Sequence, residues 1–380
     1  MTIRFDKKNM FSLAALQAIL RSRGIEVNFS SRPRDGIMIY SFATAQAADV
    51  YREIVSSYTR SIFIAGGPHP SARATEALEL FDFVVVGEGE ETLPELILAL
   101  RGDGDVDEVR GIAFKSSDGT RTNAPRPYVN LDAYPPFVEN LRAPIEISRG
   151  CPYGCKYCQT PRLFGTKMRH RSAAAVAFYS SYLSDVRFIS PNAFAYGSDG
   201  RHTAMTRVTE LLTSQRGRLY FGTFPSEVRP EFVTDELLET VKEHCANTSV
   251  HIGAQSGSDE VLREVRRGHT CGDVEVAIEV CCAHSITPVV DFIFGLPTEV
   301  TEDQLQSLEL IDSIVSKGGR VRAHYFTPLP GTPYEDQEPA PVPSIVGKRL
   351  GKLARDGKVT GRWEPSHLRH KKTNDLKQSP

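Results

Sequence analysis

The sequence has little that would suit a secreted, membrane-spanning or polyanion-binding protein. No stretch approaches the roughly 18 consecutive apolar residues that a membrane span needs. The apolar run Phe11–Leu20 is short, is followed by Arg21 and lacks a small-residue cleavage site, which argues against a secretory signal. The formal net charge is only −2, so no general attraction to nucleic acid or to an anionic membrane is expected. These absences together predict a cytoplasmic protein with neither a membrane nor a nucleic acid as partner.

Cysteine is also scarce, and its distribution is uneven. The chain of 380 residues has seven cysteines, and the first of them is Cys151. An odd count with three tightly clustered members does not fit a disulfide framework. In a reducing compartment such thiols stay free to bind metal. The composition is otherwise that of an ordinary globular protein, and the length is comfortable for two domains.

Short apolar runs alternate with helical patterns over residues 1–103. Strands are expected at Thr2–Phe5, Ile25–Phe29, Ile37–Phe42, Ser61–Ala65 and Phe83–Val86, with helices at Ser12–Arg23, Ala45–Ser56, Ser71–Leu80 and Glu91–Leu100. This alternation predicts a parallel sheet covered by helices on both faces, which is an α/β, doubly wound, Rossmann-like domain. Residues 104–143 are rich in Asp, Gly and Pro, and we expect a linker or a small hairpin there.

The β–α alternation resumes in residues 144–335. Six further strands are expected at 145–148, 186–189, 218–222, 249–252, 287–292 and 320–325. Six such units predict a partial (β/α)6 barrel of parallel strands. Residues 336–380 are interpreted as a C-terminal extension, in which the basic segment from Lys348 onward is expected to be solvated or disordered.

The three clustered cysteines, Cys151, Cys155 and Cys158, have the spacing C-x3-C-x2-C. Three thiolates can bind three irons of a [4Fe–4S] cluster and leave the fourth iron open to a substrate. Chance would produce this spacing in roughly a few sequences per thousand. A zinc site would need a fourth ligand, and no Cys or His stands close by in a usual pairing. A ferredoxin site needs four cysteines. The position of the loop after a barrel strand favours catalysis, because barrels carry their chemistry at that end.

This spacing, with an aromatic residue before the last cysteine, resembles the signature of the radical S-adenosylmethionine (SAM) superfamily. The resemblance implies that Tyr157 packs against the adenine of SAM. The segments Pro225–Arg229 and Gly253–Glu260 also resemble SAM-contacting segments of that family. The family's Gly-Gly-Glu after the second strand is replaced here by Ser190–Gly197. The residues that the resemblance assigns to SAM are Tyr157, Ser190, Asn192, Ser226, Glu227, Gln255, Ser256 and Arg267.

The N-terminal domain resembles the cobalamin-binding domain that precedes the barrel in many radical SAM enzymes. Two glycine-rich turns each follow a strand and open a helix, where glycine lets a ligand approach the backbone. The Asp-x-His-x-x-Gly motif is missing, because Asp6–Phe11 contains no histidine, so no imidazole ligand comes from that loop. A degenerate domain with an empty pocket is the alternative. The residues assigned to cobalamin are Ser41, Gly66, Gly67, His69, Gly87, Glu88, Gly89 and Glu90.

The resemblance implies a cobalamin-dependent radical SAM enzyme that makes a 5′-deoxyadenosyl radical and methylates an unactivated carbon. It also implies an external electron donor such as a flavodoxin or ferredoxin, and it leaves the substrate open, with a small molecule as one possibility. No catalytic residue is assigned beyond the cluster ligands. One alternative is radical oxidation or rearrangement without methyl transfer and without cobalamin. A non-enzymatic, metal-stabilised binding protein is less consistent with the SAM-type segments. Transfer RNA methylthiolation is set aside, because that group carries a second cluster on three upstream cysteines.

Overall fold

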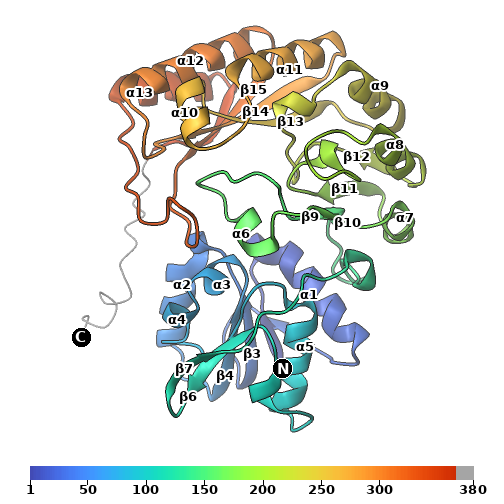
Figure 1. The fold of residues 1–380 in the computed structure, drawn as a ribbon, viewed down its shortest axis with the longest axis vertical. Helices are drawn as coiled ribbons and strands as arrows, with labels where there is room; N and C mark the ends of the chain where they lie inside the picture. The colour runs from blue at the N-terminus through green and yellow to red at the C-terminus, as the bar shows by residue number, and fades with distance from the viewer. Residues whose placement is uncertain (365–380) are drawn as a thin grey trace. The chain divides into compact units, whose positions relative to one another are not determined.

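The structure is a computed structural model that describes residues 1–364 (Figure 1). The chain divides into two compact units. Among the described residues, the first consists of residues 1–143 together with Leu329–Gly331, and the second consists of residues 144–328 and 332–364. No helix within residues 1–364 combines the length and the apolar character that a membrane crossing requires. Each unit is described below by itself.

The first unit contains a seven-stranded sheet with the order β2-β1-β3-β4-β5-β6-β7. Strands β1 to β5 are parallel, and β6 and β7 join as an antiparallel pair at one edge. The order of the parallel strands, 2-1-3-4-5, is that of flavodoxin-like doubly wound sheets. The strands are β1 Thr2–Arg4, β2 Asn28–Ser30, β3 Gly36–Ser41, β4 Ser61–Gly66, β5 Phe83–Val85, β6 Ile112–Ser116 and β7 Gly119–Thr122.

Helices cover both faces of this sheet, because successive side chains of a strand point to opposite sides. Ile39 and Ile64 pack with α1 (Met10–Ser22) and α5 (Gly89–Leu100) on one face. Met38 and Phe63 pack on the other face with α2 (Thr44–Val55) and α4 (Ala74–Ala77), next to the short α3 (Pro68–Ala72). The β6–β7 pair shows that residues 104–143 contain a hairpin that extends the sheet, with Ile112 and Ala113 buried.

The second unit contains two sheets of parallel strands, with the orders β12-β11-β8 and β13-β14-β15-β16. A parallel bridge between Val228 and Ile252 links the loop after β12 to β13. Strands β9 and β10 form a separate antiparallel pair. The strands are β8 Ile145–Glu146, β9 Ser148–Arg149, β10 Arg169–His170, β11 Asp185–Ile189, β12 Arg218–Tyr220, β13 Ser249–Gln255, β14 Thr287–Phe294, β15 Arg320–Tyr325 and β16 Val359–Arg362.

The helices of this unit are interspersed with the strands along the chain (Figure 1). They are α6 Thr160–Phe164, α7 Ala173–Ser180, α8 Met205–Thr213, α9 Asp235–His244, α10 Asp259–Glu264, α11 Cys271–Ala283, α12 Thr301–Ser316 and α13 Ser344–Arg355. Short 3-10 turns occur at η1 Lys7–Asn9, η2 Val106–Glu108, η3 Leu131–Ala133, η4 Ala193–Ala195 and η5 Pro230–Phe232. The alternation of strand and helix is the pattern that buries a parallel sheet behind helices.

The expectation that the chain is solvated from Lys348 onward is wrong as far as residue 364. Val346, Leu350 and Leu353 are buried along one side of α13. Their spacing of three and four residues gives the helix an apolar face to bury. Strand β16 then pairs with β15 in parallel, with Val359 opposite Val321. The remainder of the predicted basic tail, residues 365–380, lies outside the described residues.

Candidate active site

The cysteine loop, residues 151–158, follows β9 and precedes α6. Backbone hydrogen bonds tie it to the rest of the second unit. The Cys151 N–H donates to the Gly165 carbonyl at 3.1 Å, and the Lys156 N–H donates to the Val265 carbonyl at 3.0 Å. Because both the start and the middle of the loop are anchored, the positions of the three thiols are set by the packing of this unit.

The thiols lie close enough to interact electrostatically. Burial raises the pKa of the Cys151 thiol, and the neighbouring thiols Cys158 and Cys155 raise it further, whereas the cation of Arg229 lowers it. Burial also raises the pKa of Cys158, and Arg267 opposes that shift. Within residues 1–364 no three His, Cys, Asp or Glu side chains are arranged around one metal ion. A [4Fe–4S] cluster differs from such a site because each thiolate binds its own iron.

Arg267 connects the cysteine loop to the end of β13. Its Nη1 donates to the sulfur of Cys155 at 3.9 Å, and its Nη2 donates to the Gly253 carbonyl at 2.8 Å. A Cβ on Gly253 would lie only 2.6 Å from Nε2 of Gln255, 2.8 Å from Nη2 of Arg267 and 3.3 Å from Oε2 of Glu227. The missing side chain of Gly253 therefore makes room for three of the residues assigned to SAM, and the structure brings these three together.

Gln255 holds an unusual backbone conformation at this point. Its φ is 75°, in the left-handed region that residues other than glycine rarely adopt. The pairing of β13 with β14 shifts by one residue between Gly253 and Gln255. A bulge of this kind re-aims a side chain next to a site. The Gln255 side chain consequently lies near Arg267 over Gly253.

The other residues assigned to SAM are distributed over the loops that follow the strands. The Ser226 hydroxyl donates to the Phe188 carbonyl at 2.7 Å, and the Ser256 hydroxyl accepts from the Ser258 N–H at 3.2 Å. The Ser226 hydroxyl therefore ties its loop to β11, and the Ser256 hydroxyl shapes its own turn. Tyr157 packs beside an apolar cluster that includes Val261, Val265, Leu296, Phe326 and Tyr334. A contact of these residues with SAM stays a prediction.

Asn192 and Arg267 are the residues of this group with a buried side-chain donor that has no hydrogen-bond partner. Asn192 is 3% exposed, and its Oδ1 accepts from the Arg229 N–H at 3.4 Å. Its own N–H donates to the Ser190 hydroxyl oxygen at 3.3 Å. The amide nitrogen of its side chain is buried without a hydrogen-bond partner. A buried donor of this kind is costly unless a ligand or water accepts from it.

Three polar residues that the sequence analysis did not assign lie on one face of β14 and β15. Oδ1 of Asp291 is 3.3 Å from Nε of Arg322 and 3.2 Å from Nε2 of His324. Oδ2 of Asp291 has no partner, and the residue is 2% exposed. The sequence shows a single charged residue, Asp291, within β14 and alternating polar residues in β15, but it does not show that these side chains meet.

Glu227 belongs to the same electrostatic group. Burial and the like charge of Asp291 raise the pKa of Glu227 to about 7, against the opposing effects of Arg322 and Arg267. A carboxyl group with this pKa can be protonated or ionised near neutral pH. Perturbed carboxyl groups of this kind are typical of functional sites.

In the first unit, the residues assigned to cobalamin lie at the carboxyl ends of parallel strands. Ser41 ends β3, Gly66 ends β4, and Gly67 follows with a φ of 95°. A Cβ on Gly67 would lie 3.0 Å from the backbone of Phe42, so only glycine fits there comfortably. Gly87, whose φ is 83°, and Gly89 flank the start of α5. Open α/β sheets bind ligands at this edge.

The polar members of this set are turned into the unit. His69 is 6% exposed, with Nδ1 3.3 Å from the Thr44 hydroxyl and Nε2 3.6 Å from Glu76. Oε2 of Glu88 accepts from the Val129 N–H at 2.8 Å. Glu90 is 8% exposed. Their contact with cobalamin stays a prediction, and so do those of the glycines.

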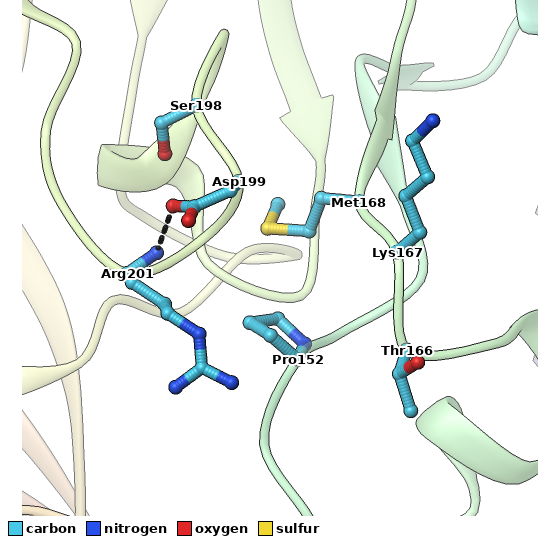
Figure 2. Close-up of a pocket in the computed structure, with 7 residues that line it drawn as sticks. All are labelled: Pro152, Thr166, Lys167, Met168, Ser198, Asp199 and Arg201. Carbon is cyan, nitrogen blue, oxygen red and sulfur yellow. Dashed lines mark hydrogen bonds between the residues drawn. The ribbon is translucent and has the colours of Figure 1, made fainter.

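A pocket of about 420 Å³ opens beside the cysteine loop, next to Pro152 (Figure 2). Lys167 and Arg201 come from opposite sides of it, and Oδ1 of Asp199 accepts from the Arg201 N–H at 2.9 Å. The sequence offered no motif for this pocket. Its lining residues are Pro152, Thr166, Lys167, Met168, Ser198, Asp199 and Arg201.

Comparisons with known proteins agree with this geometry. A methylthiotransferase-like protein of Methanocaldococcus jannaschii is 25% identical over 295 residues, which cover 71% of this chain and 63% of that protein. The solved structure of the radical SAM methyltransferase TsrM from Kitasatospora setae, with cobalamin and a [4Fe–4S] cluster bound, has a TM-score of 0.67 at 16% identity. The match covers 88% of this chain and 76% of the TsrM chain.

The cobalamin-dependent SAM radical enzyme OxsB, solved with aqua-cobalamin and SAM bound, has a TM-score of 0.62 at 20% identity, over 82% of this chain and 51% of its own. These two structures share the fold of the chain, which spans about half of OxsB and less than two thirds of the methanogen protein. The model of the Radical SAM superfamily matches residues 145–311. Residues 145–311 are therefore a radical SAM domain, which implies a [4Fe–4S] cluster and SAM as cofactors.

Proposed function

We propose that this radical SAM enzyme methylates an unactivated carbon in a cobalamin-dependent reaction. The observation that carries the proposal is the contact of Arg267 with both Cys155 and Gly253, which joins the cysteine loop to the segment assigned to SAM. The proposal assigns residues 1–103 to cobalamin, residues 104–143 to a connecting hairpin and residues 144–335 to the radical reaction. Residues 336–380 form the extension.

Different residues of the second unit would bind the cluster and SAM. Cys151, Cys155 and Cys158 would hold the cluster, which, when bound, supplies the electron that cleaves SAM to a 5′-deoxyadenosyl radical. The guanidinium of Arg267 suits the carboxylate of SAM, because charge-assisted hydrogen bonds are the strong ones. The carboxyl group of Glu227 suits the amino group of SAM, because an anionic acceptor strengthens a hydrogen bond from a charged donor.

The first unit supplies a ligand edge of the type that a large planar cofactor needs. The turns at Gly67 and Gly87 have positive φ, and the Cβ position of Gly87 faces open space. Backbone without side chains permits close approach of a ligand. When bound there, cobalamin would supply the methyl group. The missing histidine in Asp6–Phe11 predicts that no imidazole from that loop binds its metal.

The substrate is proposed to be polar. Asp291, Arg322 and His324 share one face of adjacent strands, and the unpartnered Oδ2 of Asp291 can accept a hydrogen bond from a substrate. Reduction of the cluster requires an external donor, for which we propose a flavodoxin or ferredoxin.

A second candidate keeps the radical chemistry without methyl transfer and without cobalamin. The inward contacts of His69 with Thr44 and of Glu88 with Val129 favour it. Glu88 therefore has a partner without a corrinoid, and Nδ1 of His69 has one too, whereas Nε2 of His69 is buried without a hydrogen-bond partner. The product would then be oxidised or rearranged.

The test measures three quantities on protein produced without oxygen and with cobalamin supplied. We expect about four irons per chain, near-stoichiometric cobalamin, and 5′-deoxyadenosine from SAM when a chemical reductant is added. Iron and 5′-deoxyadenosine without cobalamin would support the second candidate. Zinc in place of iron, or no SAM cleavage by iron-loaded protein, would contradict both.

A further inference from the structure

Arg229 is a buried cation whose contacts converge on the cysteine loop. It is 3% exposed and follows the loop after β12. Its guanidinium carbon lies 3.5 Å from the centre of the Tyr153 ring. Tyr153 stands between the ligands Cys151 and Cys155, so the stack touches the loop at its middle. A desolvated cation over an aromatic ring is attracted to the negative face of that ring more strongly than an exposed one.

The same side chain contacts two further segments. Nη2 of Arg229 donates to the Arg267 carbonyl at 2.5 Å, and Nε donates to Oε1 of Glu231 at 2.5 Å. Arg267 in turn contacts Cys155 through its side chain. Gly268 lies beside both partners, since a Cβ at this position would stand at contact distance, 3.6 Å, from Nη2 of Arg229 and from the ring of Tyr153. Arg229 therefore joins the cysteine loop to the segment that carries Arg267, the other cation near the loop.

The cluster of groups around Arg229 is incompletely satisfied. Nη1 of Arg229, Oε2 of Glu231 and Nδ1 of His269 are buried without hydrogen-bond partners. His269 uses Nε2 against the Ala254 carbonyl at 3.0 Å, and its Nδ1 lies 3.7 Å from Glu231. A buried guanidinium N–H without an acceptor is costly, and an anionic group beside the loop would remove that cost.

We propose that Arg229 is a positioning residue that holds the cysteine loop through Tyr153 and, with Glu231, sets the reduction potential of the cluster. The inference rests on the proposed function only in requiring the cluster. A cluster gains one negative charge on reduction, and its potential depends on nearby charge and burial. The cation of Arg229 favours the reduced form, and the anion of Glu231 opposes it.

The experiment is a redox titration of the iron-loaded full chain, followed by electron paramagnetic resonance without SAM or substrate. Arg229→Gln should shift the midpoint to a more negative potential, because the cation is lost. Glu231→Gln should shift it to a less negative potential, because Arg229 then lacks its counter-ion. Arg229→Lys should keep the midpoint close to that of the original chain while loosening the loop, seen as faster iron loss to a chelator.

The matched control is Arg187→Gln. Arg187 also stacks on a tyrosine, with its guanidinium carbon 4.2 Å from the Tyr220 ring centre, but it is not among the charges that act on the thiols of Cys151 and Cys158. The midpoint potential of the Arg187→Gln variant should equal that of the original chain. If Arg229 has only a structural role, all iron-loaded variants should have the same midpoint potential, and that result would overturn the proposal. Midpoint shifts of the same sign for Arg229→Gln and Glu231→Gln would overturn it as well. If Arg229→Gln fails to fold, Glu231→Gln decides alone. An unmodified chain that binds no iron would instead count against the proposed function.

Discussion

Arg267 and Cys155 are 112 positions apart in the chain, and Nη1 of the arginine donates to the sulfur of the cysteine at 3.9 Å. The contact raises the pKa of Arg267 through the nearby thiol and tyrosine, in spite of the opposing effect of burial, so the guanidinium stays charged. The cysteine loop and the end of β13 therefore depend on each other electrostatically.

Arg267→Met should weaken SAM binding by roughly tenfold to a hundredfold, because a hydrogen bond to a charged group contributes about 1.5–3 kcal/mol. Equilibrium dialysis of SAM against iron-loaded protein measures the effect. Arg263→Met on the exposed side of α10 is the control and should bind SAM normally. If the two variants bind SAM with equal affinity, the assignment of Arg267 to the SAM site is contradicted.

Replacing Cys151, Cys155 or Cys158 singly by Ala should abolish stable cluster binding, because each thiolate binds one iron. Iron analysis and the visible absorption of anaerobically reconstituted protein report the loss. Cys282→Ala is the matched control, since Cys282 is exposed on α11. Iron loading that survives in any of the three ligand variants would contradict the assignment.

Glu227→Gln should change how stability depends on pH. The folded-state pKa of Glu227 is raised to about 7 from an ordinary value of 4.5, so the folded chain binds this proton more tightly than the unfolded chain. The stabilisation is complete below about pH 4.5 and is lost as the pH rises toward 7. The free energy of unfolding of the variant should not show this decrease with pH, which amounts to roughly 1–3 kcal/mol in the original chain.

Urea unfolding of the iron-free chain between pH 5 and pH 8 measures this difference in the free energy of unfolding. Glu260→Gln, at an exposed position in α10, serves as the control and should follow the original chain. If the Glu227→Gln profile parallels the original across this range, Glu227 does not titrate as inferred.

Leu350→Ala should destabilise the second unit by about 2–5 kcal/mol, because it removes a fully buried side chain of α13. Lys348→Ala, at an exposed position of the same helix, should change stability by less than about 0.5 kcal/mol. Thermal or urea unfolding distinguishes the two. Equal, small effects would mean that the segment after residue 343 is not part of the fold.

Local patterns in the sequence were sufficient for two results. The spacing of Cys151, Cys155 and Cys158, with Tyr157 before the last, indicated the radical SAM domain, because cluster ligands within one loop are read from spacing alone. The alternation of apolar runs and helical patterns indicated α/β architecture, because the periods of strands and helices are local properties. Neither result required knowledge of which strands pair.

The tertiary structure decided the rest. The stack of Arg229 on Tyr153 and the contacts of Asp291 with Arg322 and His324 join distant parts of the chain. Nothing in their local sequence predicts such contacts. The burial of α13 was not predicted because the chain from Lys348 onward is rich in Lys and Arg, whereas three apolar positions on one face of the helix decide its packing. Composition and period are properties of a segment, but a site is made by the partners that folding brings to that segment, and those partners depend on strand order and register.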